Sequence, residues 1–425
     1  MKRERGAALI LVLLGLVTVT MLAGAFVNLG IYEQRFSERS QGSSQAFYLA
    51  ESAVDRGLVW LRSQLVPPQG VQRLVLFGGW QALGTSGSYL ATVQPDANNT
   101  ASQIKRYTVE GWGAAGPQAE PVAMHRTSLV VQTESFAQYA YFTDSERSWP
   151  NGIQVYFITA DRIEGPTHTN GQFAMYGRPV FEGPVSSVAN RIEYWGGSQF
   201  TQPVFREPPK LGVPAKQFPR SYPTTIVDAA REGGTVLRGD TAVALLADGT
   251  MRVTNTGGGI RNQVMPLPPN GVLYVEGGSV TLQGTLKGQL TIGTSGDVRV
   301  VNSVTYASDP RVNPQSKDLL GIVAGQNVTV ARGAPNNVTI DASIMALNRS
   351  FGVEGWWERP PRGTLSVYGG IVQANRGVVG SFNGSNGTKL SGFTKDYRYD
   401  PRLRSMSPPF FPTTGDYSTL VWQED

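Results

Sequence analysis

No cysteine occurs in the 425 residues, and histidine occurs only twice, as His125 and His168. The absence of cysteine excludes a disulfide framework, thiolate-bound zinc or iron–sulfur centres, and a cysteine nucleophile. Two histidines cannot by themselves supply a three-histidine metal site. His168 lies in a polar, turn-like stretch, so we predict a structural role for it. The sequence therefore predicts neither a metal centre nor a cofactor.

Charged residues are also scarce, at 16% of the chain against about 25% in typical proteins. Glycine and proline are frequent instead, with 50 and 27 residues. This composition excludes a charge-rich disordered chain or a coiled coil, and it is typical of β proteins with many turns. The net charge of +5 gives little support for nucleic-acid binding, for which only a local basic patch would be evidence.

The motifs of several enzyme classes are missing too. The chain has no P-loop, no G-x-S-x-G, no HExxH and no EF-hand loop. A carbohydrate-active β-solenoid enzyme needs two or three carboxylates on adjacent coils, whereas the acidic residues here are scattered and are predicted to hydrogen-bond in turns: Asp297, Asp309, Asp318 and Asp341. We predict that the chain is not an enzyme and has no catalytic residues; a membrane-anchored carbohydrate-active enzyme is the less favoured alternative.

A long apolar segment lies close to the N-terminus. Residues 2–6 read Lys-Arg-Glu-Arg-Gly, and the 26 residues 7–32 carry no charged side chain. As a helix they would extend roughly 39 Å, enough to cross a bilayer core of about 30 Å with the basic end in the cytoplasm. The first proline in the chain is Pro67. Between the apolar span and this proline, apolar residues recur at helical spacing. We therefore predict one helix over residues 7–66, membrane-spanning first and amphipathic afterwards.

This region resembles type IV prepilins, more closely the PilX/PilK-like minor pilins. The resemblance is carried by the basic leader ending at Gly6, the apolar span from Ala7, and the string Ala-Phe-Tyr-Leu-Ala-Glu-Ser-Ala at residues 46–53. It implies that prepilin peptidase cuts between Gly6 and Ala7 and that the new N-terminus is methylated. Most pilins have glutamate at the fifth mature position, where this chain has Leu11; in the resembled families the subunit that caps the tip lacks this glutamate.

Two other interpretations of the N-terminus stay open. One is a cleaved secretory signal, with Ala23-Gly24-Ala25 as its exit, and the other is an uncut signal anchor. If the prepilin leader is removed, Lys2, Arg3, Arg5 and Glu4 are lost and the charge falls from +5 to +3.

The rest of the chain is predicted to be β-rich. Three strand-like runs, Ser88–Gln94, Arg106–Trp112 and Val122–Thr133, predict a small antiparallel sheet on the second half of the helix. From about Ser135, short apolar runs end at Gly or Asn every six to ten residues, most plainly in residues 277–301. This pattern predicts a right-handed β-solenoid, with a β-sandwich as the alternative.

The predicted fold class is thus α+β, and the architecture resembles that of large competence pilins with a C-terminal β domain. The proline-rich residues 203–223 are predicted to be an extended surface loop, and residues 397–412 a strap along the β domain. The predicted division is residues 1–6 as leader, 7–66 as helix, 67–135 as antiparallel sheet, and 136–425 as β-solenoid-like domain with its strap.

Two clusters of aromatic and basic residues are candidate sites for binding a polymer. Such clusters hold single-stranded nucleic acids by stacking and phosphate contacts, and aromatic rings with fewer charges suit sugars. The alternative is a self-packed loop and a tail held on the surface. The candidate residues are Trp356, Trp357, Arg359 and Arg362 in the first cluster, and Tyr397, Arg398, Tyr399, Arg402 and Arg404 in the second.

Together these features predict a minor pilin-like subunit at or near a pilus tip. Its β domain would bind extracellular DNA in natural transformation, or a surface or glycan; a purely structural or priming pilin, or an adhesin, is the alternative. The resemblance implies other minor and major pilins, prepilin peptidase and the inner-membrane assembly platform as partners. It also implies a path from the inner membrane through the periplasm to the cell surface.

Overall fold

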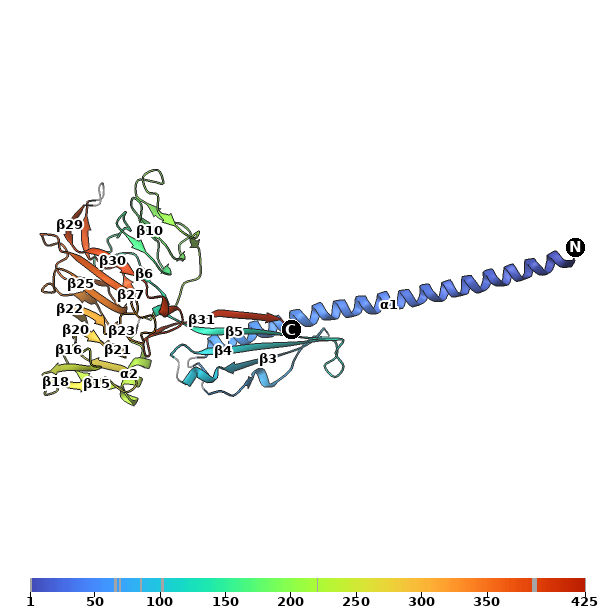
Figure 1. The fold of residues 1–425 in the computed structure, drawn as a ribbon, viewed down its shortest axis with the longest axis horizontal. Helices are drawn as coiled ribbons and strands as arrows, with labels where there is room; N and C mark the ends of the chain where they lie inside the picture. Colours follow the sequence, from blue (N-terminus) through green and yellow to red (C-terminus); the bar gives the residue numbers. More distant parts are fainter. Residues whose placement is uncertain are drawn as a thin grey trace. The chain divides into compact units, whose positions relative to one another are not determined.

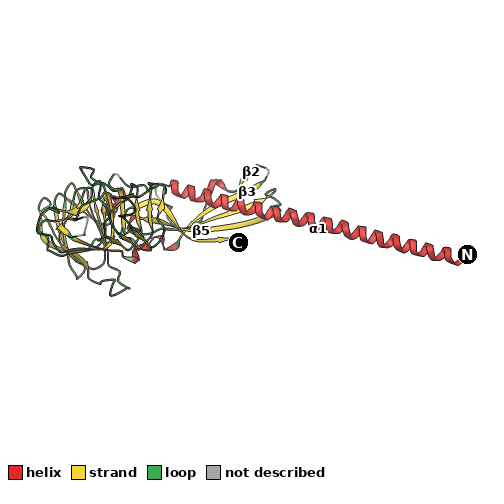
Figure 2. Ribbon diagram, turned by 90° about the horizontal axis from the view of Figure 1, so that it is seen from above, coloured by secondary structure: helices red, strands yellow, loops and turns green. Residues whose placement is uncertain are grey.

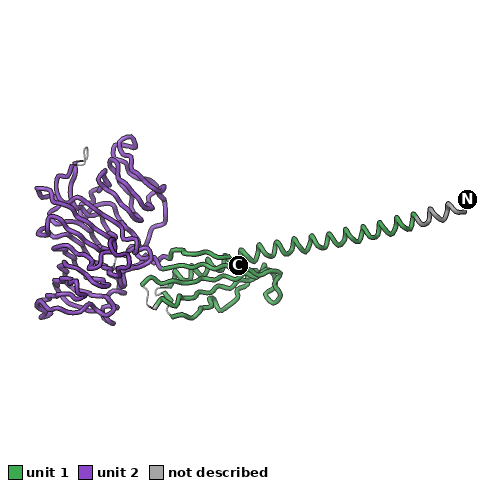
Figure 3. Tube along the Cα trace, in the orientation of Figure 1, with its two compact units in different colours: residues 1–132, 417–425 green, residues 133–416 purple. Residues whose placement is uncertain are grey.

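The chain folds into two compact units, residues 1–132 with 417–425 and residues 133–416 (Figure 3). The computed structural model describes residues 2–64, 67–68, 70–84, 86–100, 103–219, 221–383 and 388–424, and for residues 2–10 and Thr100 it describes only the backbone. The cleavage site expected at Gly6 and Ala7 therefore has no described side chains. These bounds differ from the predicted ones, because residues 417–425 belong to the first unit.

Unit 1 begins with one long helix, α1, which spans Lys2–Ser63 (Figures 1 and 2). The predicted long N-terminal helix is confirmed, and it ends shortly before Pro67, which cannot continue a helix. Among the described residues, the part of α1 from Leu11 is long and apolar enough to cross a membrane. Its residues are exposed from 11 to 41, and buried positions begin at Gly42.

The second half of α1 packs on a sheet with the order β1-β3-β4-β5-β31, in which β2 also pairs with β3. The three runs predicted from the sequence correspond to its long strands, and each neighbouring pair of these is antiparallel. The strand bounds are Leu74–Val75 (β1), Gln81–Leu83 (β2), Gly87–Pro95 (β3), Arg106–Ala115 (β4), Ala123–Ser135 (β5) and Thr413–Glu424 (β31).

The core of unit 1 lies between α1 and this sheet. Leu49, Val54 and Leu61 of α1 are buried against Tyr107 and Val109 of β4, as the helical spacing of apolar residues predicts. The helix and β4 approach closely at Gly111 and Gly113. A Cβ atom at Gly113 would overlap the carbonyl oxygen of Ala46 and lie 2.6 Å from the amide nitrogen of Ala50.

Unit 2 consists of short strands that stack mainly in parallel. The largest stack has the order β15-β19-β21-β23-β25-β27-β6-β8-β11-β14. In each neighbouring pair except β27 with β6, the paired residues are 18 to 38 positions apart in the sequence. A second parallel stack has the order β16-β20-β22-β24-β26, and β25, β27 and β30 form a third. Neighbouring strands of these stacks are thus parallel and, apart from β27 with β6, come from stretches that lie close together in the sequence.

The remaining pairs are smaller. Strands β7, β10 and β13 stack in parallel, as do β9 and β12, while β16-β17-β18 and β28-β29 are antiparallel. The bounds of the strands of unit 2 are Tyr141–Ser145 (β6), Arg162–Ile163 (β7), Thr167–Thr169 (β8), Ala174–Met175 (β9), Val180–Phe181 (β10), Val185–Ser187 (β11), Glu193–Tyr194 (β12), Val204–Phe205 (β13), Lys210–Leu211 (β14), Thr235–Arg238 (β15), Thr241–Leu245 (β16), Thr250–Asn255 (β17), Ile260–Pro266 (β18), Val272–Glu276 (β19), Val280–Leu286 (β20), Gln289–Thr294 (β21), Val298–Tyr306 (β22), Leu319–Ala324 (β23), Val328–Val330 (β24), Val338–Ala346 (β25), Phe351–Val353 (β26), Thr364–Asn375 (β27), Gly380–Phe382 (β28), Lys389–Gly392 (β29) and Thr394–Arg398 (β30). The predicted α+β class, with a helix, a small antiparallel sheet and a large all-β domain, is confirmed.

The chain enters this stack in its middle rather than at one end. From β6 it winds in one direction to β14, and it resumes at the opposite end of the stack with β15. The connection runs through residues 212–219 and 221–223, which form neither helix nor strand, and then through α2 (Thr224–Glu232). The extended loop predicted over residues 203–223 is therefore shorter than expected, because residues 204–205 and 210–211 form β13 and β14. Proline cannot donate a hydrogen bond to a central strand, which suits the rest of this passage.

The C-terminal tail has two parts. Tyr399, Leu403 and Phe411 are buried in a core cluster of unit 2. From Thr413 the chain forms β31, which joins the sheet of unit 1 next to β5. The sequence-based division missed this strand because the pattern of residues 413–424 does not specify which sheet edge they join.

Candidate functional site

The first predicted polymer-binding cluster is only partly exposed. Trp356 packs against the core of unit 2, and its ring meets that of Trp357 edge to face at 5.7 Å. The Arg362 guanidinium donates hydrogen bonds to the carbonyl oxygens of Pro335 and Ala334 and lies over the Phe393 ring. Trp357 and Arg359 are the exposed members of this cluster.

The second predicted cluster is divided between core and surface. Tyr397 packs against the core, and Tyr399 is buried. Arg402 is held by Asp400, with 2.6 Å between Nη2 and Oδ2, and it also donates to the carbonyl oxygens of Ser316 and Asp318. Arg398, which is paired with Asp396, and Arg404 are exposed. The alternation of aromatic and basic residues in the sequence therefore does not produce a continuous exposed strip.

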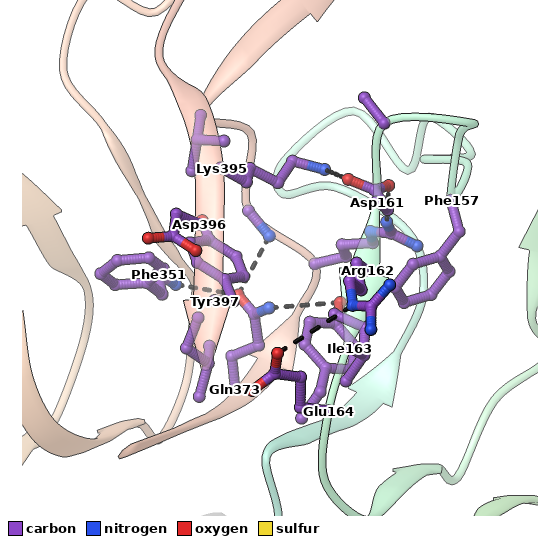
Figure 4. Close-up of a pocket in the computed structure, with 16 residues that line it drawn as sticks. Phe157, Asp161, Arg162, Ile163, Glu164, Phe351, Gln373, Lys395, Asp396 and Tyr397 are labelled. Atoms are coloured by element: carbon purple, nitrogen blue, oxygen red, sulfur yellow. Dashed lines mark hydrogen bonds and ion pairs between the residues drawn. The ribbon is translucent and has the colours of Figure 1, made fainter. Parts of the chain in front are cut away.

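A small cavity of about 80 Å³ with both polar and apolar lining lies in unit 2, and its lining comes from several stretches of the chain (Figure 4). Arg376, which is buried beside it, donates a hydrogen bond of 2.7 Å to Oε2 of Glu146. The same guanidinium donates to the carbonyl oxygens of Val155 and Tyr156 and lies 3.6 Å from the centre of the Phe157 ring.

A second ion pair completes this group of charges. The Lys395 ammonium lies 2.6 Å from Oδ1 of Asp161, whose other oxygen accepts the N–H of Ile158. Burial raises the pKa of Glu146, and the nearby Arg376 charge opposes that rise. We call Glu146, Asp161, Arg376 and Lys395 the ionic cluster; its two positive and two negative groups balance.

The ionic cluster connects segments that are far apart in the sequence. Glu146 follows β6, and Arg376 follows β27. Lys395 lies on β30, and Asp161 lies just before β7. The cavity beside it has room for a few water molecules, whereas pockets for small-molecule ligands measure about 300–1,000 Å³. The arrangement acts as a cross-link between coils rather than as a substrate site. No sequence motif marks these four residues, so sequence reasoning missed them.

Of the scattered aspartates, Asp309 accepts the N–H of Arg311 within its own turn, whereas Asp297 and Asp318 bridge coils. Asp297 accepts the N–H of Asn327, and Asp318 accepts those of Gly288 and Ser308. These are backbone hydrogen bonds, as predicted, but they reach into neighbouring turns rather than staying within the residue's own turn. The carboxylate oxygens of Asp297 and Asp318 are therefore already used as hydrogen-bond acceptors. The two residues are scattered in the sequence because they lie at the corners of different coils.

Asp341 differs from the other aspartates because it is buried on β25. It lies 3.2 Å from the Arg311 guanidinium, which also pairs with Asp309, and it accepts the N–H of Tyr306. Burial raises the pKa of Asp341 to about 6, although Arg311 acts in the opposite direction.

This pKa predicts a pH-dependent stability. The Asp341 carboxyl titrates near 3.9 in an unfolded chain and near 6 in the folded protein, so the folded state binds more protons between these values. The free energy of unfolding should therefore fall as the pH rises from about 4 to about 6, by up to about 3 kcal/mol. Urea denaturation at several pH values should show this decrease in the wild type and a weaker decrease in Asp341→Asn. Equal slopes for the two proteins would contradict this interpretation.

His168 is fully buried, and its two ring nitrogens lie 2.8 Å from the hydroxyl of Ser186 and 3.1 Å from the side-chain oxygen of Asn170. Burial lowers its pKa. The predicted structural role agrees with these contacts. Within the part of the chain that the structure describes, no group of three or more His, Asp or Glu side chains is arranged to hold a metal ion.

Comparisons with known proteins give few matches. Residues 103–189 match a family model described as a domain of unknown function, DUF4900. No curated protein matches the chain. Among solved structures, the competence-associated pilin ComZ from Thermus thermophilus is similar over 90% of this chain and 97% of its own, with 13% sequence identity and a TM-score of 0.37. A likeness at this level carries no argument about function.

Proposed function

We propose that this chain is a minor type IV pilin-like subunit, held by the first half of α1 and presenting unit 2 outside the cell. The observation that supports this most is the division of α1 into two halves. Its second half is buried against the sheet, whereas Leu11, Val19 and Phe26 in the first half are 70%, 64% and 72% exposed. So much exposed apolar surface requires a bilayer or the helices of neighbouring subunits.

The residue at position 11 supports a place at or near the pilus tip. A glutamate there would neutralise the N-terminal amine of the next subunit inside an apolar environment. A subunit with nothing above it has no such amine to neutralise, and Leu11 fits this condition. The partners would be minor and major pilins, prepilin peptidase and the inner-membrane assembly platform. The protein would pass from the inner membrane to the cell surface.

Unit 2 would then be the part that meets the medium, where it binds extracellular DNA or a surface. Trp357, Arg359, Arg398 and Arg404 are the predicted polymer-binding residues with exposed side chains. Binding to DNA would weaken steeply with salt, whereas stacking on a glycan would depend little on salt. A purely structural or priming subunit remains the alternative if unit 2 binds neither.

The leader provides the test of this proposal. In cells that assemble type IV pili, the wild-type protein should begin at a methylated Ala7, and Gly6→Leu should leave the leader attached because a bulky residue blocks the peptidase. Mass spectrometry of the membrane fraction measures both N-termini. Gly24→Leu, at the alternative signal-peptide exit, is the matched control and should mature normally. Normal maturation of Gly6→Leu, or an N-terminus near residue 25, would contradict the proposal.

A further inference from the structure

Exposed and half-buried aromatic residues lie on the coils that include β9 and β12. These coils stack in parallel, with Phe157 beside Met175 and Met175 beside Tyr194. Phe157 and Met175 point into the core, where both are buried. Successive residues of a strand point to opposite sides. Tyr156 precedes Phe157, Tyr176 follows Met175, and Trp195 follows Tyr194, so these three residues face outward.

The rings of these residues contact one another at the surface. Trp195 is 56% exposed, and its ring centre lies 5.7 Å from that of Tyr156 and 6.3 Å from that of Tyr176. The interplanar angles of 81° and 65° mean that the rings meet edge to face rather than face to face. Phe200, which is 70% exposed, comes shortly after Trp195 in the chain, and its ring lies beside Gly196.

A fifth ring, that of Trp149, lies in the hairpin-like turn before Tyr156. Trp149 is 55% exposed, and the Arg349 guanidinium lies 5.9 Å from its ring centre. Arg147 donates to the carbonyl oxygen of Gly152, and its charge opposes the rise that burial causes in the pKa of Tyr156. Neither Arg147 nor Arg349 has a carboxylate partner in the described part of the chain. We call Trp149, Tyr156, Tyr176, Trp195 and Phe200 the aromatic strip.

The aromatic strip has the properties of a binding surface rather than of a core. Contiguous exposed apolar surface on a folded protein usually marks an interaction site. Open ring faces stack either on nucleic-acid bases or on the apolar C–H faces of sugar rings. A nucleic acid also needs a track of positive charge for its phosphates. Here Arg349 lies at the ring of Trp149 and the charge of Arg147 acts on Tyr156, and Glu193 accepts a hydrogen bond from Tyr156 among them.

We propose that the aromatic strip binds a polysaccharide that carries uronic acid carboxylates. Sugar rings would stack on Trp195 and Trp149, and Arg147 and Arg349 would bind carboxylates, for which guanidinium groups have a matching geometry. The inference rests on the proposed function in one respect, because unit 2 must face the medium to meet such a polymer.

The test measures binding of the full-length protein in detergent micelles to three probes: polygalacturonate, its methyl ester, and single-stranded oligothymidylate. Polygalacturonate should bind, and Trp195→Ala or Trp149→Ala should each weaken binding about tenfold. Arg349→Ala should weaken binding to polygalacturonate but leave binding to the uncharged methyl ester unchanged. Trp422→Ala is the matched control, because Trp422 on β31 is 42% exposed but lies outside the strip and outside both predicted polymer-binding clusters, and it should bind as the wild type does.

Three results would overturn the proposal: no binding of polygalacturonate, tighter salt-sensitive binding of oligothymidylate, or equal loss in Trp422→Ala and Trp195→Ala. Thermal denaturation of each variant shows whether it is folded. If a tryptophan variant does not fold, the surface variant Arg349→Ala still tests the proposal. This outcome is separate from that of the leader experiment. A protein that begins at Ala7 but binds no probe keeps the pilin proposal and loses the polysaccharide.

Discussion

Replacement of Arg376 by methionine is expected to lower the free energy of unfolding of unit 2 by about 3–5 kcal/mol. The substitution keeps an apolar chain of similar length but removes the cation beside Glu146, whose side chain is 1% exposed. Asp161 keeps its pair with Lys395, so Glu146 alone is left as an uncompensated buried charge. Urea denaturation of the full-length protein in detergent, followed by tryptophan fluorescence, measures the loss.

The double variant Glu146→Gln/Arg376→Met is the control for this explanation. Without the carboxylate no buried charge is left unpaired, so the double variant should recover a large part of the loss. The deficit of the single variant should also shrink at low pH. Loss of Arg376 raises the pKa of Glu146 further, and a group with a raised pKa stabilises the folded state only at low pH and loses this effect as the pH rises through that pKa. A double variant as unstable as the single one would contradict the unpaired-charge explanation.

The parts of the fold that follow from local patterns could be predicted from the sequence. The charge-free span and the helical spacing after it determine α1, because burial on one side needs that periodicity. Alternating residues determine β3, β4 and β5 in the same way. The recurring glycines in residues 277–301 indicate coils, since residues such as Gly277, Gly284 and Gly288 adopt positive φ values of 66°, 109° and 115°.

The sites could not be predicted because they depend on which coils become neighbours. The ionic cluster forms only because β6 stacks on β27, although more than 220 residues separate Glu146 from Arg376. Tyr397, Tyr399 and Arg402 are predicted polymer-binding residues because they lie near one another in the sequence. Packing turns the two tyrosines inward, however, and Asp400 holds the arginine. The aromatic strip likewise appears only when Tyr156, Tyr176 and Trp195 are stacked.

The second large effect is expected at the contact between α1 and β4. Gly113→Val should destabilise unit 1 by about 3 kcal/mol or more, because the added atoms overlap backbone rather than flexible side chains. A Cβ atom at this position would overlap the carbonyl oxygen of Ala46 and lie 2.8 Å from Cβ of Leu49. The helix would have to move away from the sheet, which would also expose Val54 and its neighbours.

Hydrogen–deuterium exchange can measure this loss separately for the two units. In Gly113→Val, the amides of β3, β4 and β5 should exchange about a hundredfold faster or more, since each 1.4 kcal/mol of lost stability corresponds to a factor of ten. The amides of β19 to β25 in unit 2 should keep their protection, because that core does not depend on α1. Gly333→Ala is the matched control, since a Cβ atom at Gly333 meets nothing within 4 Å. Unchanged exchange in β4 of Gly113→Val would show that the second half of α1 is not held on the sheet by this close contact, and would remove the packing on which the pilin-like interpretation of unit 1 depends.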